Sequence, residues 1–583
     1  MKERSLRSPQ SGLLLCCHQA TTTFVHFGSA GRTYRRYFYS HRTYRFKCLS
    51  VRGLRTFVTA QRLVVTLLQV SMNKNSLGVF SISEESVEEP RTLQDTVSSE
   101  SFAAETLRSR FFAPWFPSFF FPAVGCLLFG YDIGCTSSVL RVLGNIQASL
   151  SSNFGDLSSL TLGLIASSSL FGALVSSVVA FRFGDSLGRK KELVLSSILY
   201  SVGTLMEALS PNVPFLFFAR LLFGAGIGFS MHAAPIYIAE CVPSEKRGLL
   251  ISLKEAFIVS GMVFGYLVGA LWEPSFSHLD YLLSWRLMFG SGIIACLLFF
   301  LGVLFIPESP RWLVLKSSQT SESFLSRSYI ELARSSLIRL ARNNKQVAEQ
   351  QLASLMQALR EGSLEPTEFH GVFSYSELLK PQSLKPLFIA LSLVTFQQIT
   401  GQPSVLYFAN RIFEDAGLGF IAAVGLGVWK LVMTIGSSIF VDKVGRRPLL
   451  LIGATGITMA LFVLSWLFSG TNEVSFQVPI VAFIFIYVGA YQIGFGPITW
   501  LILSEIFPLR VRSASLAIGT LVNFGMNLIV TFTFELEREW FGTSGLFLQF
   551  ALIGIVSVWF IYEKVIETKG LTLEEIEIKL RGG

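Results

Sequence analysis

Long apolar segments recur along most of this 583-residue chain and restrict the folds that it can adopt. Twelve of them approach the roughly 20 residues that a helix needs to cross a bilayer. They lie near 117–139, 160–181, 192–210, 214–236, 250–271, 285–306, 386–408, 420–441, 448–469, 477–502, 512–534 and 543–563. Backbone in lipid must satisfy its own hydrogen bonds, so segments of this length are helices. We predict an all-α membrane protein with twelve transmembrane helices in two six-helix halves.

Three charged patterns occur once in each half, about 260 residues apart. The first is Asp185, Gly188, Arg189 and Lys190, which returns as Asp442, Gly445, Arg446 and Arg447. The second is Glu240, Pro243 and Arg247, which returns as Glu505, Pro508 and Arg512. The third joins Glu308 to Glu567. Duplicated hydrophobic halves with charged connections at matching places are the sequence signature of a transporter.

The repeated charges fall on one side of the predicted bundle. Basic loop residues mark the cytosol- or stroma-like side, which then carries both termini and the middle loop. We expect the acids and bases of the repeats, with Arg311 near Glu308, to form clusters that close this face and break when it opens. Ordinary anchoring by basic loops is the alternative.

Composition excludes a soluble protein and a nucleic-acid partner. Charged residues make up 15% of the chain and hydrophobic ones 51%, whereas a soluble domain carries about 25% charged residues. The net charge of +9 arises in residues 1–83, which hold 13 Lys or Arg and one acid, so the remainder is slightly acidic. A body without basic surfaces has no electrostatic footprint for nucleic acid. Its expected surroundings are the lipid bilayer.

Residues 1–83 form a basic extension without any acid between Arg4 and Ser83. Its content of Arg, Ser, Thr and Tyr is typical of an organelle transit peptide. A cytosolic tail without fixed structure and a wrongly chosen start codon are the alternatives. We expect a protein of the plastid envelope, with the vacuolar and plasma membranes as alternatives.

The chain divides into six regions by composition. After 1–83 come an acidic linker at 84–116, the first half at 117–306, a middle loop at 307–385, the second half at 386–563 and a tail at 564–583. Alternating charge at helical spacing predicts short surface helices in the middle loop.

Residues for covalent chemistry are missing from the sequence. None of the seven Cys forms a CxxC pair, and there is no nucleophile–base set, metal-ligand cluster or phosphate-binding loop. We therefore expect no cofactor and no metal, and the chain is not an enzyme.

Motifs across residues 117–580 resemble those of the sugar porter family of the major facilitator superfamily. They are GDSLGRKK, ARLLFGAGIG, PIYIAE, PESPRWL, FQQITGQPSVLY, VDKVGRRPL, GPITWLILSEIFPLRVR and IETKG. FGYDIG, SLKE and QQITGQPSVLY are most similar to the plant D-xylose-proton symporter-like group, which includes vacuolar and chloroplastic members. One departure is Ile566, where the family usually has Pro. The resemblance implies the major facilitator fold and a monosaccharide as substrate.

Asp132 lies in the middle of the first apolar segment. An isolated acid there costs about 2.5–3.5 kcal/mol on insertion scales, so a partner or a function is expected. The resemblance makes Asp132 the proton-titrating carboxylate and Arg220 its partner, so that protonation would release the arginine. A static structural ion pair is the alternative.

The resemblance also supplies a set of sugar-binding residues. These are the amides Gln397, Gln398 and Asn523, the stacking Trp500, and, as a gate or contact, Tyr407. Core packing would explain any one of them, but their joint occurrence at the family's spacing favours binding.

Three positions differ from better-known relatives. Glu255 replaces a sugar-binding Gln, Pro403 a helix-7 Asn, and Lys430 a helix-8 Asn. Single charges within a bundle are costly, and opposite ones offset that cost when they meet. We therefore hypothesise a Glu255–Lys430 pair at the central cavity; direct sugar binding by Glu255 is the alternative. His232 fits a packing role better than proton traffic.

These observations predict a monosaccharide transporter that works by alternating access, coupled to protons, with a single chain as the functional unit. A facilitative uniporter of the same fold and a non-transporting sugar sensor are the alternatives.

Overall fold

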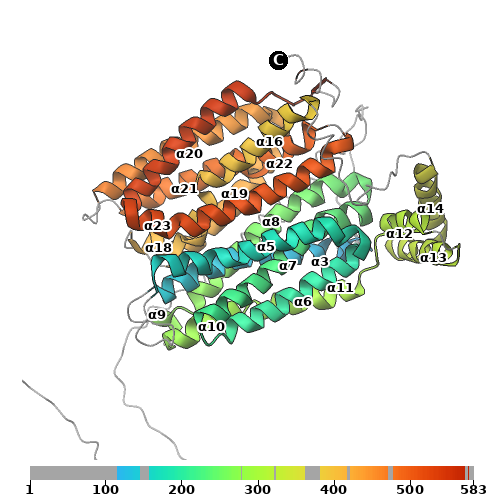
Figure 1. Ribbon diagram of the computed structural model, residues 1–583, viewed down its shortest axis with the longest axis horizontal. Coiled ribbons are helices and arrows are strands. Elements are labelled where there is room, and N and C mark those ends of the chain that lie inside the picture. Colours follow the sequence, from blue (N-terminus) through green and yellow to red (C-terminus); the bar gives the residue numbers. More distant parts are fainter. Residues whose placement is uncertain are drawn as a thin grey trace, which may run out of the picture. The chain divides into compact units, whose positions relative to one another are not determined.

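The structure of this chain is a computed structural model. It describes residues 114–144, 157–277, 279–320, 323–360, 381–415, 420–470, 477–507 and 509–570, with 575, 576 and 579, and all belong to one compact unit, Gln94–Gly583. This part of the chain is helical, with no strand (Figure 1). The prediction of an all-α fold is confirmed.

The first half begins with five long helices and ends with a broken sixth. They are α3 (Phe116–Leu143), α5 (Ser159–Leu187), α6 (Arg189–Ala208), α7 (Val213–Cys241), α8 (Ser244–Leu271), the short α9 (Pro274–Ser277), α10 (Tyr281–Gly290) and α11 (Ile293–Phe305). Glycines let neighbouring helices approach closely. A Cβ on Gly130 of α3 would lie 1.7 Å from the carbonyl oxygen of Ile258 on α8.

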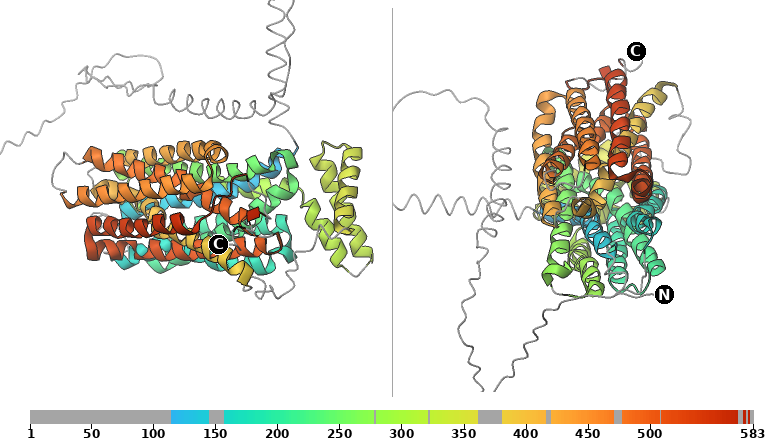
Figure 2. Two further views of the ribbon diagram at one scale, coloured as in Figure 1. Left: turned by 90° about the horizontal axis from the view of Figure 1, so that it is seen from above. Right: turned by 90° about the vertical axis from the view of Figure 1, so that its left-hand side faces the viewer.

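The middle segment forms three helices with a small core of their own. They are α12 (Pro310–Gln319), α13 (Ser323–Leu340) and α14 (Lys345–Arg360). Trp312, Ala333 and Leu352 are buried among them. Figure 2 shows this bundle at one end of the long helices.

The second half repeats the long helices with more interruptions. They are α16 (Pro381–Ile399), α17 (Gln402–Tyr407), α18 (Ala409–Asp415), α19 (Phe420–Val444), α20 (Arg446–Ser469), α21 (Gln477–Ile493), α22 (Phe495–Glu505) and α23 (Leu509–Lys564). The φ angles of Gly401 (+84°), before α17, and Gly542 (+68°), inside α23, are ones that only glycine adopts without strain. Gly542 divides α23 into the last two predicted spans.

Nine helical stretches in the described residues are long and apolar enough to cross a membrane. One of them, Ser515–Lys564, covers two predicted spans. The remaining two predicted spans lie in α6, whose first turn is charged, and in α16–α17, which Gly401 interrupts. Each of the twelve predicted segments thus has a helical counterpart.

The two halves meet near the C-terminal ends of α3 and α8. Helix α5 packs on α23, α8 on α19, and α3 on α17 and α18. The hydroxyl of Tyr266 donates to the carbonyl oxygen of Leu406 at 2.7 Å, and Arg141 lies 3.1 Å from Glu414. These joins lie toward the side opposite to the charged repeats.

The third helix of each half starts at a repeated glycine and receives its cap from a distant carboxylate. Gly188 and Gly445 precede α6 and α20 with φ of +95° and +110° and supply no side-chain cap. The first N–H groups of a helix need acceptors. Glu308 accepts from the N–H of Lys190 at 2.9 Å. Glu567 accepts from the N–H groups of Arg446 and Arg447, both at 3.0 Å.

The repeated glutamates and arginines pair within each half. Arg189 lies 3.6 Å from Glu240, and Arg446 lies 3.0 Å from Glu505. None of these described pairs joins one half to the other. The expected clusters are therefore present, but in this conformation they connect helices of the same half rather than closing one half on the other.

The two capping carboxylates differ in their electrostatics. Burial, the largest influence, raises the pKa of Glu308 although backbone N–H groups oppose it. Burial also acts to raise the pKa of Glu567, but hydrogen bonds from the N–H groups of Lys569, Arg446, Arg447 and Thr568 outweigh it and lower that pKa. The Glu567 cap is therefore favourable as a carboxylate, whereas ionised Glu308 carries a desolvation cost.

We expect Glu567→Gln to lower the free energy of unfolding by about 1 kcal/mol at neutral pH, as loss of a cap does, and Glu308→Gln to lower it less. A folded-state pKa below the unfolded value gives stability that is present at neutral pH and lost as pH falls through the folded value. The deficit of Glu567→Gln should thus vanish in acid. Denaturation of detergent-purified protein across pH measures both, with the exposed Glu563→Gln as control. A larger loss for Glu308→Gln at neutral pH would contradict the assignment.

Candidate functional site

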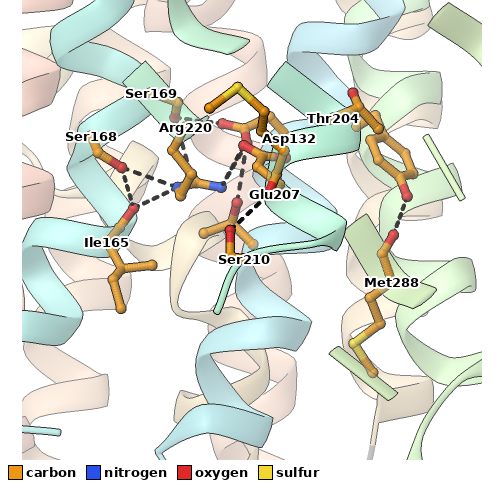
Figure 3. Close-up of polar contacts among 12 residues, drawn as sticks. Asp132, Ile165, Ser168, Ser169, Thr204, Glu207, Ser210, Arg220 and Met288 are labelled. Atoms are coloured by element: carbon orange, nitrogen blue, oxygen red, sulfur yellow. Dashed lines mark hydrogen bonds and ion pairs between the residues drawn. The ribbon is translucent and has the colours of Figure 1, made fainter. Parts of the chain in front are cut away.

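Asp132 lies inside the first half, 2% exposed, at the middle of α3. Its Oδ1 accepts from Thr136 at 3.2 Å and lies 3.1 Å from Nη1 of Arg220. Its Oδ2 accepts from Ser169 at 2.7 Å (Figure 3) and from Tyr407 at 3.3 Å. Both carboxylate oxygens are thus satisfied by groups from four helices, as a buried charge requires.

Arg220 is fully buried on α7 and held by α5. Its Nε donates to the carbonyl oxygen of Ile165 at 2.6 Å and to Ser168 at 3.1 Å, and its Nη2 donates to Ser169 at 3.0 Å (Figure 3). The close approach depends on Gly224, where a Cβ would lie 1.9 Å from the carbonyl oxygen of Ser169. The structure therefore brings the predicted Asp132–Arg220 pair together.

Glu207 on α6 is a third charged residue of this site, and sequence analysis missed it. It is 2% exposed, and its Oε1 lies 3.8 Å from Nη1 of Arg220 (Figure 3). It falls near the end of a predicted span, where a charged side chain normally extends to the interface. Its burial follows from the packing of α6 against α7, which hydropathy does not show.

Contacts from the second half reach this site through α17 and α18. Tyr407 is fully buried on α17 and donates to Asp132, and Asn410 on α18 donates through Nδ2 to Ser138 at 3.0 Å and to Ser137 at 3.3 Å. Tyr407 therefore links the halves at the buried carboxylate.

The predicted sugar-binding amides lie together in the second half. Nε2 of Gln398 on α16 donates to Oδ1 of Asn523 on α23 at 2.6 Å, and Nε2 of Gln397 donates to the carbonyl oxygen of Phe495 at 2.8 Å. The side-chain oxygen of Gln398, Oε1, is buried and accepts no hydrogen bond from the described residues. The amide nitrogens of both glutamines are thus bonded within the second half.

Trp500 lies in the middle of α22, the helix that follows the break at Gly494. It is partly buried and packs against the main hydrophobic core. Gln397 holds this break by its hydrogen bond to Phe495. The tryptophan and the amide are therefore supported by the same local structure.

The expected Glu255–Lys430 ion pair is not formed in this structure. Glu255 on α8 pairs instead with its chain neighbour Lys254, at 3.3 Å. Lys430 lies on α19. Glu255 is therefore not the single charge that the prediction assumed, because the adjacent base Lys254 is close enough to pair with it. Pro403 is buried in the first turn of α17.

The other predicted residues lie on the side of the charged repeats. Nδ1 of His232 lies 2.7 Å from Oε1 of Glu192, in keeping with a packing role. Arg311 is half-buried in the first turn of α12. The side chains of Asp185, Arg247, Asp442 and Arg512 fall outside the described residues.

Comparisons with known proteins agree with this architecture. Residues 119–580 match the family model described as "Sugar (and other) transporter". A protein named D-xylose-proton symporter-like 1 from Arabidopsis thaliana is 44% identical over 79% of this chain and 90% of its own length. D-xylose-proton symporter-like 3, chloroplastic, from the same plant, is 41% identical over 83% of this chain and 85% of its own.

Solved structures show the same fold. The inward-open conformation of the xylose transporter XylE from E. coli aligns with a TM-score of 0.64 at 27% identity, covering 79% of this chain and 98% of that one. The family match spans most of the chain, and both curated relatives exceed 40% identity. The chain therefore belongs to the sugar transporter family, the sugar porters of the major facilitator superfamily.

Proposed function

We propose that this protein carries a monosaccharide across a membrane together with a proton, by alternating access between its two halves. The observation that carries the proposal is the buried carboxylate of Asp132, paired with Arg220 in one half and bonded by Tyr407 of the other. A uniporter needs no titratable acid at this place. Relatives named as D-xylose-proton symporter-like, and the proton:xylose symporter XylE among the structural neighbours, support the coupling.

A proton binding to Asp132 would alter both of these contacts. The neutral acid attracts Arg220 less, and its oxygen accepts less strongly from Tyr407. The contact between the halves is thereby sensitive to the proton. Proton binding can thus be coupled to the movement of the halves without a covalent step.

The driving force suffices for accumulation. One pH unit supplies about 1.36 kcal/mol, and a potential of 100 mV supplies about 2.3 kcal/mol per charge. Their sum supports a gradient of several hundred-fold at one proton per sugar.

The second half supplies the groups that would hold the sugar. Gln397, Gln398 and Asn523 offer amide donors and acceptors to hydroxyls, and Trp500 offers an apolar face for the C–H side of the ring. Glu255 on α8 and Lys430 on α19 lie on helices that pack together, and they are further candidates for lining the central cavity that the sugar would occupy. A pentose or a hexose fits this chemistry.

A single chain contains both the proton residues and the sugar residues. We therefore propose that the monomer is the functional unit, within a lipid bilayer.

Replacement of Asp132 by Asn tests the coupling. In proteoliposomes with an imposed pH gradient, inside alkaline, we expect the unmodified protein to accumulate labelled xylose or glucose. Asp132→Asn keeps the shape but cannot bind and release a proton, so accumulation should be abolished while exchange of labelled for unlabelled sugar persists. Accumulation by the variant would refute the role of Asp132, and absence of a pH effect on the unmodified protein would favour a uniporter.

Replacement of Gln398 by Ala tests the sugar site. We expect sugar affinity to fall about 10- to 100-fold, because a hydrogen-bonded hydroxyl is worth about 1–3 kcal/mol when its partner is left unpaired. Equilibrium binding to the purified protein measures this, with the exposed Gln351→Ala on α14 as a matched control. Unchanged affinity in Gln398→Ala would remove this amide from the site.

We further propose that residues 1–83 direct the protein to the plastid envelope. Their acid-poor composition and the relative named as chloroplastic support this. A fluorescent fusion of the full chain in plant cells should label the plastid rim, and a fusion that starts at residue 84 should not. Labelling of the vacuolar or plasma membrane by the full chain would contradict the proposal.

A further inference from the structure

The buried site of the first half holds two carboxylates for one guanidinium. Asp132, Glu207 and Arg220 are each 2% exposed or less. When all three are ionised, the site carries one negative charge in excess. An uncompensated charge in a membrane interior is strongly unfavourable. One bound proton removes the excess.

The guanidinium nitrogen Nη1 of Arg220 faces both acids. It lies 3.1 Å from Oδ1 of Asp132 and 3.8 Å from Oε1 of Glu207 (Figure 3). The second distance exceeds a hydrogen bond, and Oε1 of Glu207 accepts no hydrogen bond from the described residues. A displacement of Nη1 by less than 1 Å would exchange its nearer partner.

The neighbours of Glu207 provide no other charge to balance it. Among the described residues, the charges that act on it are Arg220 and Asp132. The uncharged titratable groups around the three residues are Tyr131 and Cys135 on α3, Tyr200 on α6, Cys296 on α11 and Tyr407 on α17. Arg286 on α10 donates to the carbonyl oxygen of Ser210 instead.

We propose that Glu207 is the second carboxylate of the proton site, sharing one transported proton with Asp132 across Arg220. This rests on the proposed coupling of transport to protons. When the proton is on Asp132, Arg220 pairs with Glu207; when the proton leaves, Arg220 returns to Asp132. The guanidinium is therefore never left unpaired, and each cycle binds one proton from one side and releases it to the other.

The pH profile of uptake by Glu207→Gln tests the proposal. Without the second carboxylate, Asp132 and Arg220 balance each other, so the site has no excess negative charge and binds the transported proton less readily. We expect the pH of half-maximal uptake in proteoliposomes to move about one unit toward acid, a tenfold change in proton activity. Maximal uptake in acid and the sugar KM should remain. Glu207→Asp keeps the charge but moves it away from Arg220, so a smaller acid shift is expected.

Thr204→Val provides a matched control in the same buried helix. Thr204 is 1% exposed one turn from Glu207, and its hydroxyl contacts Sγ of Cys296 at 3.3 Å, so its loss removes no charge. Its midpoint should equal that of the unmodified protein. A Glu207→Gln variant that is slower by the same factor at every pH would overturn the proposal, as would an unchanged midpoint.

Two outcomes separate this inference from the proposed function. If the unmodified protein fails to accumulate sugar under a pH gradient, the coupling itself is refuted. If it accumulates sugar and the Glu207 variants keep its midpoint, only the role of Glu207 is refuted. Should Glu207→Gln fail to fold, Glu207→Asp decides, because an unshifted profile there contradicts the proposal.

Discussion

The ion pair between Asp132 and Arg220 is the interaction on which the working part of this protein depends. Charges inside a bilayer are tolerated only when they are paired and hydrogen-bonded. The structure meets this requirement with hydroxyls of α3 and α5 and with the Ile165 carbonyl. The same helices must pack closely at small residues to deliver these groups. The ion pair at the centre of the first half therefore depends on the close packing of the helices around it.

The two halves share the work unevenly. Charged residues of the first half form the buried cluster, whereas uncharged amides of the second half lie around α16, α22 and α23. The broken helices of the second half suit this division, because breaks free backbone and side-chain groups within the bundle. Tyr407 connects the two regions, since it lies on the short helix between the amides and Asp132.

Sequence alone predicted the helices well, because the thickness of the bilayer sets the length of apolar segments. It also identified Asp132, since an acid in the middle of such a segment is conspicuous. Glu207 escaped because its position near a helix end is compatible with solvent. Gln398 and Asn523 are far apart in the chain; family resemblance indicated each as a sugar-binding residue, and their contact is seen only in the structure. The pairing of Glu255 with Lys430 was wrong because distances in the folded structure decide between Lys254 and Lys430, and hydropathy carries no information on them.

The caps on α6 and α20 have a consequence for how the halves move. Each cap comes from a glutamate three residues beyond the end of the sixth helix of its half, Glu308 or Glu567, and joins that end to the start of the third helix. Each cap thus links the third helix to the sixth helix of the same half. Rocking of one half against the other leaves these hydrogen bonds intact, so each half can tilt as a rigid body. The free energy of opening and closing is then set at the interface between the two halves, where Asp132 accepts the hydrogen bond from Tyr407.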